Sequence, residues 1–399
     1  MWCTVATSCN STKDLIVPPP PTDPLFASYV SLGNSITAGY QSGGINDSTQ
    51  HQAYPVLLAQ QMGTPFTIAS LADPGCPPPI DSFPEGTRVG GGTSTSCSFR
   101  SQRSGVAVLN NVAVPGAFAF DPTSPIGTGG GGALTTFILG GKTQVQRALD
   151  ANPTFVSIWI GNTDVLPAAL SGVLSDSLGA AVSPGITGQQ SFEKSYSAMM
   201  TGLQAGGTIK GGVLLGVVNV ANAPVFFPAA ALFADPIIVP TLSAVVGAPI
   251  TVDTSCTPAT QSIINFELFA AMRAGTAPDT IACHALAGHA NGLGELFVLD
   301  AGEIATLSTA VANYNAFIQQ TATTAGWAYV DPNPALAALR QSGQIPIFPD
   351  LTQPTKAFGN YISLDGIHPA AAAHALLANL IINAVNTTYS THVPTIGTP

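Results

Sequence analysis

The stretch YVSLGNSITAGY, residues 29–40, decides the fold. It belongs to an apolar run that starts at residue 25 and leads into a Gly-Asn-Ser turn, so residues 25–33 are predicted to form a buried strand. Ser35 follows this strand, between Gly33 and Gly39. A serine in a glycine-rich turn at a strand end is a candidate functional residue, and its structural alternative is a cap for the next segment.

Alternating strands and helices continue along the chain. The predicted strands cover residues 25–33, 108–117, 154–164, 211–220 and 327–331. The predicted helices cover residues 54–63, 143–153, 191–207, 301–326 and 370–386. The strands are near-continuous apolar runs, which is typical of a parallel sheet covered on both faces. We therefore expect an α/β protein, a three-layer α/β/α sandwich with a central parallel sheet.

Small and polar residues lie where the predicted strands end. In open parallel sheets, ligands bind at the carboxyl ends of the strands, so residues at these ends are expected on one rim. Two further polar residues directly precede the last predicted helix. The candidates are Ser35, Gly116, Asn162, Thr163, Asp365 and His368.

The composition describes a folded protein with a weakly charged, loop-rich surface. Only 8% of the 399 residues are charged, and the net charge is −10. The chain has no basic stripe that would neutralise phosphates, which excludes nucleic acid as a partner. The most apolar region, residues 212–250, is interrupted by prolines and polar residues, so no membrane-spanning helix is expected.

The six cysteines fall into sequence-local pairs. Two pairs close short loops in Gly/Pro-rich segments, and we expect the disulfides Cys76–Cys97 and Cys256–Cys283 and an oxidising compartment. One alternative is unpaired, buried thiols. A second is a zinc site in which Cys256 joins the cysteine and the two histidines of CHALAGH, residues 283–289, although this spacing matches no common zinc finger.

The chain is expected to hold one main domain. Residues 1–25 are predicted to be a tether and linker, residues 26–386 the domain, and residues 387–399 a tail. The tether lacks a full signal peptide, but ATSC is a poor lipobox ending at Cys9, and a proline run follows. These features predict a secreted or cell-envelope protein, with peripheral membrane attachment through the N-terminus as one form of it.

Four short motifs in order resemble the GDSL, or SGNH, hydrolase family. GNSITAG is similar to the first block, with Asn34 where the family usually has aspartate, and NNVAVPGA is similar to the second, with Gly116 as its glycine. IWIGNTDVL is similar to the third block, G-x-N-D, and DGIHP matches the final D-x-x-H with Asp365 and His368. Because the four blocks cover residues 26–386 on a matching α/β pattern, the resemblance is specific.

The resemblance implies a flavodoxin-like sandwich and a serine hydrolase without metal or organic cofactor. Ser35 would be the nucleophile, His368 its base, and Asp365 would orient the imidazole. The backbone N–H groups of Ser35 and Gly116 would stabilise the oxyanion. One departure concerns the third oxyanion donor: the family's asparagine position holds Thr163, and Asn162 lies one residue earlier. Either Thr163 donates through its hydroxyl, or the loop shifts and Asn162 takes over as the donor.

Residues 223–295 form an insertion that contains Cys256 and Cys283. We expect it to cap the rim and to supply an apolar pocket, with an amphipathic helix at residues 260–275; the alternative is a scaffold elaboration away from the site. The expected function is hydrolysis of small-molecule or lipid-like carboxylic esters. An acyltransferase, a carbohydrate deacetylase and a non-catalytic binding module are the alternatives, and the oligomeric state is left open.

Overall fold

The structure is a computed structural model. It describes residues 21–99, 108–124, 132–172, 174, 176–177, 185–283 and 297–397. Its helices are α1 (Ser35–Ala38), α2 (Asp47–Gln52), α3 (Tyr54–Met62), α4 (Ala133–Leu139), α5 (Gln144–Leu149), α6 (Leu166–Ser171), α7 (Gln189–Gln204), α8 (Ala231–Ala234), α9 (Ile238–Val246), α10 (Glu267–Arg273), α11 (Ala301–Ala325), α12 (Asn333–Gln341) and α13 (Ala371–Tyr389). The described residues also form the 3₁₀ turns η2 (Pro24–Phe26), η3 (Asp121–Thr123), η4 (Asn162–Asp164) and η5 (Val220–Asn222).

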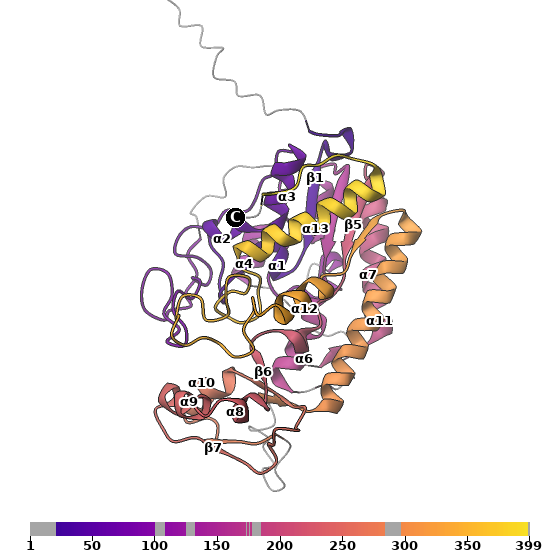
Figure 1. Cartoon of the computed structure of the whole chain (residues 1–399). Coiled ribbons are helices and arrows are strands. Elements are labelled where there is room, and N and C mark those ends of the chain that lie inside the picture. Colours follow the sequence, from indigo (N-terminus) through magenta and orange to yellow (C-terminus); the bar gives the residue numbers. More distant parts are fainter. Residues whose placement is uncertain are drawn as a thin grey trace, which may run out of the picture.

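A parallel sheet lies at the centre (Figure 1). Its strands are β1 (Tyr29–Gly33), β2 (Phe155–Trp159), β5 (Gly211–Leu215) and β11 (Ala328–Val330), in the order β1-β2-β5-β11. The segment 110–114 runs parallel along the free edge of β1, where the N–H of Val112 donates to the carbonyl of Ser31 at 3.0 Å. With this segment as the second strand, the order in the sheet is 2-1-3-4-5, the flavodoxin-like order.

Helices cover both faces of the sheet, as the apolar strands predict. Side chains at alternate strand positions, such as Tyr29 and Phe155, pack with α3 and α13. Their neighbours Val30 and Val156 pack on the other face with α5, α7 and α11. The predicted three-layer sandwich is therefore confirmed. The last helix, expected to end at residue 386, continues to Tyr389, and Asn386 accepts a hydrogen bond from the N–H of Val393.

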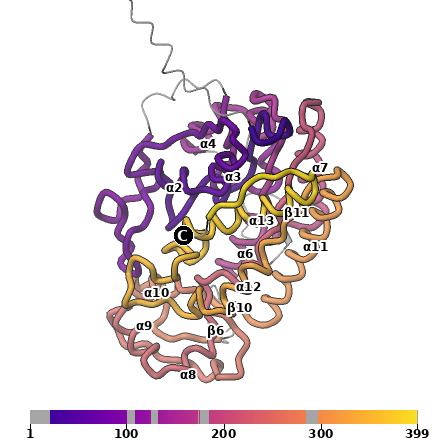
Figure 2. The backbone as a smooth tube through the Cα atoms, turned by 45° about the horizontal axis from the view of Figure 1, so that its top comes forward, coloured from indigo at the N-terminus to yellow at the C-terminus, as the bar shows by residue number. Residues whose placement is uncertain are grey.

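The insertion forms a separate group of elements at one end of the molecule (Figures 1 and 2). It contains α8, α9 and α10 and the short strands β6 (Phe226–Pro228), β7 (Thr251–Val252), β8 (Ile263–Asn265) and β9 (Thr280–Ile281). β8 lies between β6 and β10 (Val298–Leu299) in an antiparallel sheet. The strands β3 (Asp176–Ser177) and β4 (Ile186–Thr187) pair elsewhere.

The single helix predicted for residues 260–275 is wrong. Residues 263–265 form β8, and only residues 267–273 are helical. Ile263 and Ile264 have high β-propensity, and β6 and β10 satisfy the backbone of this strand from both sides. The helical periodicity of the segment therefore describes α10 alone.

Both predicted disulfides are present, Cys76–Cys97 with an S–S distance of 2.03 Å and Cys256–Cys283 with 2.06 Å. Since the Cys256 and Cys283 sulfurs are bonded to each other, neither is a thiolate ligand for zinc, and both the zinc and the free-thiol alternatives are wrong for this pair. His284 and His289 lie outside the described residues, as do Cys9 and most of the proline run.

Within the described ranges, no helix is both long and apolar enough to cross a bilayer. The same part of the chain holds no cluster of three or more histidine, cysteine, aspartate or glutamate side chains suited to a metal ion.

Candidate active site

Two glycines place Ser35 at the carboxyl end of β1. A Cβ at Gly33 would lie 2.5 Å from the carbonyl oxygen of Trp159 on the neighbouring strand, so no larger residue fits. Gly39 has φ +91° and ends α1 in the left-handed region, where a Cβ would lie 2.8 Å from the Cα of Gln50. Gly33 thus allows the close approach of the Trp159 carbonyl, and Gly39 allows the backbone to reverse direction after α1.

Ser35, His368 and Asp365 form a hydrogen-bonded chain. The Oγ of Ser35 lies 2.9 Å from Nε2 of His368, and Nδ1 of His368 lies 2.8 Å from Oδ2 of Asp365. An ionised carboxylate can only accept, so Nδ1 carries the proton and Nε2 accepts from the serine hydroxyl. Ser35 and His368 come from segments that lie more than 300 residues apart in the sequence.

Asp365 is held in place by five hydrogen bonds. Its Oδ2 accepts from the N–H of Gly43 at 2.7 Å and from the ring of His368. Its Oδ1 accepts from the hydroxyl of Ser363 at 3.0 Å and from the N–H groups of Ile367 and His368 at 2.9 and 2.8 Å. Burial alone would raise the pKa of Asp365, but the charge of His368 and these hydrogen bonds lower it to about 2. The carboxylate is therefore ionised at neutral pH.

Tyr40 lies directly against the imidazole. The two ring centroids are 4.9 Å apart, and the N–H of Tyr40 donates to the carbonyl of Ser35 at 2.9 Å. Burial, followed by the negative charge of Asp365, raises the pKa of Tyr40 to about 12, so the phenol is neutral. The sequence analysis did not identify Tyr40, although it ends the stretch 29–40. Its position directly after Gly39 is the sequence feature that indicates a place near Ser35.

Two backbone N–H groups near the serine have no acceptor in the part of the chain that the structure describes. Among the described residues, none accepts a hydrogen bond from the N–H of Ser35 or of Gly116. Gly116 has φ +80° and lies in a turn attached to β1, because the N–H of Val114 donates to the carbonyl of Gly33 at 3.1 Å. The second sequence block is thus fixed to the strand that precedes Ser35.

Asn162 and Thr163 differ in what their side chains can do. Oδ1 of Asn162 accepts from the N–H of Val218 at 2.8 Å, and its Nδ2 is sealed from solvent without a partner among the described residues. Thr163 is half-buried, and no described group is hydrogen-bonded to its hydroxyl. Asn162 therefore holds the segment after β5, while the Thr163 hydroxyl stays available.

Asp164 connects the loops of the second and third blocks. Its Oδ2 accepts from the N–H of Ala119 at 2.9 Å, so it anchors the loop after Gly116. The side chain is buried, which raises its pKa to about 7 against hydrogen bonds that lower it. This carboxyl group is structural, and its protonation is coupled to folding.

Replacing Asp164 by asparagine is expected to change how stability depends on pH. Between about pH 4 and 7 the folded wild type keeps the Asp164 proton while the unfolded chain loses it, so its free energy of unfolding falls as pH rises. The asparagine variant lacks this contribution. Relative to wild type it should therefore gain stability over this range, by at most about 4 kcal/mol at about 1.4 kcal/mol per pKa unit.

Urea unfolding of wild type, Asp164→Asn and the exposed control Asp279→Asn at several pH values measures this difference. A difference between Asp164→Asn and wild type that is constant from pH 4 to 7.5 would show that the Asp164 carboxyl does not titrate in this range.

A cleft of about 530 Å³ opens beside the hydrogen-bonded residues Ser35, His368 and Asp365, with Tyr40, Asp365 and His368 in its wall. Leu166 and Leu170 of α6 line it, and so do residues of the insertion, among them Phe266 and Ala270. The insertion therefore reaches the site, as the sequence predicted for a cap.

Two other histidines lie outside this arrangement. His51 is exposed and pairs with Asp47 on α2, and it does not line the cleft. His374 is fully buried, and its Nδ1 accepts from the N–H of Tyr54 at 3.2 Å. Burial lowers the pKa of His374 to about 3, so this histidine is neutral and has a structural role.

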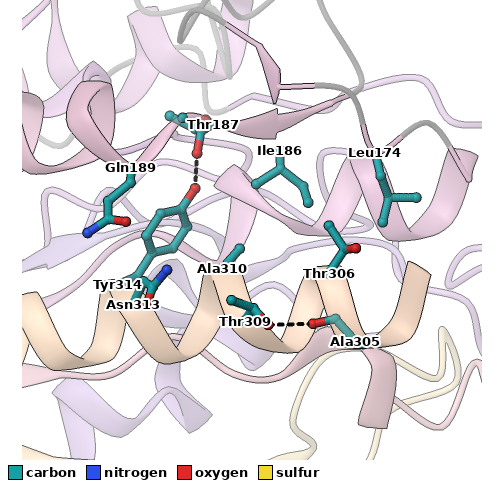
Figure 3. A pocket seen from close by; sticks show the side chains of 11 residues that line it. Leu174, Ile186, Thr187, Gln189, Ala305, Thr306, Thr309, Ala310, Asn313 and Tyr314 are labelled. Carbon is teal, nitrogen blue, oxygen red and sulfur yellow. Dashed lines mark hydrogen bonds between the residues drawn. The ribbon is translucent and has the colours of Figure 1, made fainter. Parts of the chain in front are cut away.

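A second hollow of about 450 Å³ lies between α11 and residues 186–189 (Figure 3). Tyr314 crosses it, and its hydroxyl donates to the carbonyl of Thr187. Ser35, His368 and Asp365 do not line this hollow.

No family model matches the sequence, and no curated protein matches it significantly. Among solved structures, the chain is similar to a mutant of an acetyl-xylooligosaccharide esterase from Geobacillus Stearmophilus, at 13% identity and a TM-score of 0.38, covering 90% of this chain and 93% of that one. It is also similar to an extracellular lipase from Streptomyces rimosus, at 14% identity and a TM-score of 0.37, covering 90% and 98%.

Proposed function

We propose that this protein is a serine hydrolase of the GDSL, or SGNH, kind that cleaves carboxylic esters. The observation that carries the proposal is the hydrogen-bonded chain Ser35–His368–Asp365 at 2.9 and 2.8 Å. A serine hydroxyl is a weak nucleophile until a base takes its proton, and Nε2 of His368 is oriented to do so. The ionised Asp365 keeps that imidazole in the required tautomer.

The mechanism follows from these positions. The Oγ of Ser35 attacks the ester carbonyl carbon while Nε2 of His368 takes the hydroxyl proton. The tetrahedral intermediate collapses, the C–O bond to the alcohol breaks, and His368 returns the proton to the leaving oxygen. Water then attacks the acyl-enzyme with His368 again as base, which releases the carboxylic acid and restores Ser35. This sequence uses no metal or organic cofactor.

The oxyanion is proposed to bind the N–H groups of Ser35 and Gly116 and the hydroxyl of Thr163. The two backbone donors have no acceptor among the described residues, and the Thr163 hydroxyl is likewise unengaged there. Thr163 also occupies the position that resembles the family's asparagine. Asn162 is less suited, because Nδ2, the only donor group of its side chain, is sealed from solvent.

Replacing Thr163 by valine is expected to lower kcat about 100-fold, since removal of one oxyanion donor costs about 100- to 1,000-fold. Valine keeps the shape of threonine and loses only the donor. Thr163→Ser keeps a hydroxyl and should stay within a few-fold of wild type. Steady-state kinetics at several pH values measure both, and full activity of Thr163→Val would mean that the third donor lies elsewhere.

We propose that the protein works outside the cytosol on a small-molecule or lipid ester. Two disulfides support an oxidising compartment. Attachment to a membrane through residues 1–25 stays a prediction, because residues 1–20 lie outside the described ranges.

The test is hydrolysis of p-nitrophenyl esters, from acetate to palmitate, by wild type and by Ser35→Ala. Hydrolysis by the wild type that disappears in the variant supports the proposal. A folded wild type that hydrolyses none of these esters would overturn it and point to an acyltransferase or a binding module.

A further inference from the structure

We propose that the cleft beside His368 holds an apolar group of the ester, larger than acetyl, and that α10 of the insertion limits the size of that group. This inference rests on the proposed function. It adds a substrate class and a specificity-determining element that the triad itself does not supply.

The cleft has the size and lining of a small-molecule site. Its volume of about 530 Å³ falls within the range of about 300–1,000 Å³ that is usual for ligand pockets. Aliphatic and aromatic side chains from separate segments line it, including Ile80, Phe83, Leu170, Val245 and Phe269. An apolar group that leaves water for such a surface gains about 25 cal/mol per Å² buried.

The charges in the cleft favour a neutral substrate. Arg88 and Arg273 line it, and so do Glu267 and Asp365, so the two signs balance. Arg88 is engaged within the protein, because its Nη1 donates to the carbonyls of Gly43 and Pro78 at 3.0 and 2.6 Å. Asp365 is engaged with His368, and Arg273 and Glu267 contribute one charge of each sign, so the four groups carry no net charge that would select an ionic ester.

The insertion is hydrogen-bonded to the loop that carries the triad. The N–H of Val225 donates to the carbonyl of Gly366 at 2.8 Å, between Asp365 and His368 in the chain. The carbonyl of Val225 accepts in turn from the N–H of Phe266 at 2.9 Å, and α10 starts at the next residue. Two hydrogen bonds therefore fix the start of α10 relative to the catalytic loop.

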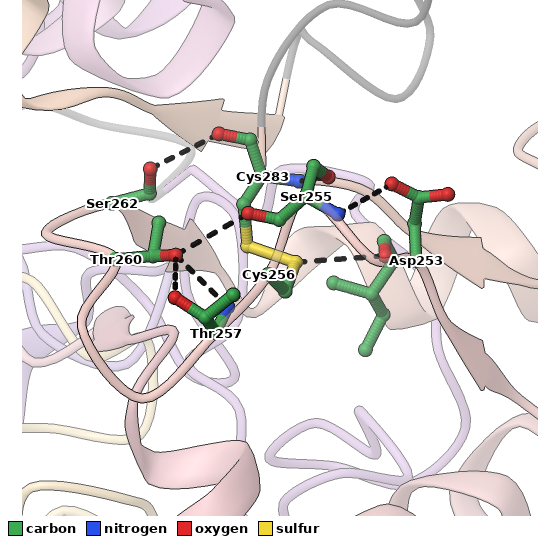
Figure 4. Close-up of a disulfide and its surroundings, with 8 residues drawn as sticks. Asp253, Ser255, Cys256, Thr257, Thr260, Ser262 and Cys283 are labelled. Atoms are coloured by element: carbon green, nitrogen blue, oxygen red, sulfur yellow. Dashed lines mark hydrogen bonds between the residues drawn. A yellow bond between two sulfur atoms is a disulfide. The ribbon is translucent and has the colours of Figure 1, made fainter.

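Aromatic contacts and a disulfide hold α10 in this place. The ring of Phe266 lies 5.0 Å from Phe83, and Phe83 lies 5.1 Å from Phe358, so three segments meet at the cleft. The Cys256–Cys283 disulfide encloses the segment that contains α10, and the hydroxyl of Ser262 donates to the carbonyl of Cys283 at 3.1 Å (Figure 4). α10 is therefore a preformed wall of the cleft, and it selects substrates by size because it does not move to accommodate larger ones.

Ala270 is the position at which this wall can be tested. It lies on α10, lines the cleft and is exposed, so a larger side chain there enters the cleft without displacing core residues. Ala274 follows one turn later and is also exposed, but it does not line the cleft. Ala270→Phe and Ala274→Phe therefore make a matched pair with the same chemical change.

The experiment compares kcat/KM of wild type and both variants on p-nitrophenyl esters from acetate to palmitate. Wild type is expected to prefer an acyl chain longer than acetate. Ala270→Phe is expected to lower kcat/KM at least about tenfold for that preferred ester, with acetate nearly unchanged, since one methylene in an apolar pocket is worth about 10- to 200-fold. Ala274→Phe is expected to reproduce the wild-type profile.

A second series, acetate esters of alcohols of increasing length, distinguishes the two parts of the substrate. An Ala270→Phe effect confined to the first series places the acyl group in the cleft, and an effect confined to the second places the alcohol there. A wild type that is active only on acetate and prefers no longer chain in either series overturns the inference. Equal chain-length profiles for wild type and both variants also overturn the inference. A wild type that is inactive on every ester speaks against the proposed function itself.

Discussion

Replacing Ser35 by alanine is expected to lower kcat for p-nitrophenyl ester hydrolysis by about 10⁵-fold or more. The substitution removes one atom, the Oγ that is proposed to form the bond to the acyl carbon. His368 then has no nucleophile to activate, although its own hydrogen bond to Asp365 remains. The N–H donors of Ser35 and Gly116 are unaffected, so the small residual rate is expected to come from substrate binding and the oxyanion site alone.

The fold of Ser35→Ala is expected to survive, which makes the kinetic loss interpretable. Among the described residues, the Oγ of Ser35 hydrogen-bonds only to His368, and alanine is accepted at the start of a helix as short as α1. Circular dichroism and the thermal midpoint, with the exposed Ser48→Ala as a control, check this. A folded Ser35→Ala that keeps more than about one hundredth of the wild-type rate would identify a different nucleophile.

The sheet and the positions of the three triad residues follow from local sequence patterns. Apolar strands of the parallel type end at Gly33 and Trp159, and a parallel sheet brings their carboxyl ends to one rim. The residues that follow them, Ser35 and Thr163, could therefore be predicted as neighbours without any contact information. His368 could be predicted because DGIHP resembles the final D-x-x-H block of the GDSL, or SGNH, family and directly precedes the last helix, at the same rim.

The groups that support the triad could not be predicted in this way. Gly43 and Ser363 bind the carboxylate of Asp365, and Ser42 joins them through its N–H, which donates to Oγ of Ser363 at 2.8 Å. These contacts connect residues 42–43 to residues 363–365, and glycine and serine carry no periodicity that marks such a pairing. Only the tertiary structure shows that residues 42–43 hold the carboxylate of Asp365 in place.

The insertion marks a second limit of sequence reasoning. The disulfide in it was predicted because two cysteines in a Gly/Pro-rich segment close a short loop. The division of residues 260–275 into β8 and α10 was not, because a strand of three residues is defined by its partners and not by its own pattern. β6 and β10, which supply those partners, lie on either side of β8 in the chain and could not be assigned to it in advance.

Replacing Asp365 by asparagine is expected to lower kcat by about 10⁴-fold. An amide has one acceptor oxygen, whereas both carboxylate oxygens of Asp365 accept. With its NH₂ toward His368, the amide would donate to Nδ1 and force the proton onto Nε2, which could then no longer accept from Ser35. With its NH₂ toward Ser363, the amide would instead face the N–H groups of Ile367 and His368 and distort the catalytic loop.

The pH dependence of the free energy of unfolding distinguishes loss of the Asp365 charge from a general loss of folding in Asp365→Asn. Asp365 has a pKa of about 2 in the folded chain, below its ordinary value of 3.8, so it stabilises wild type above about pH 4. This contribution to the free energy of unfolding is lost as pH falls from about 4 to about 2. The free energy of unfolding of Asp365→Asn should therefore fall less than that of wild type over this range. Acid unfolding of wild type and variant, with the exposed Asp81→Asn as the control, measures it. If Asp365→Asn folds and keeps nearly full activity at pH 7, the carboxylate does not orient His368, and the role proposed for it here is wrong.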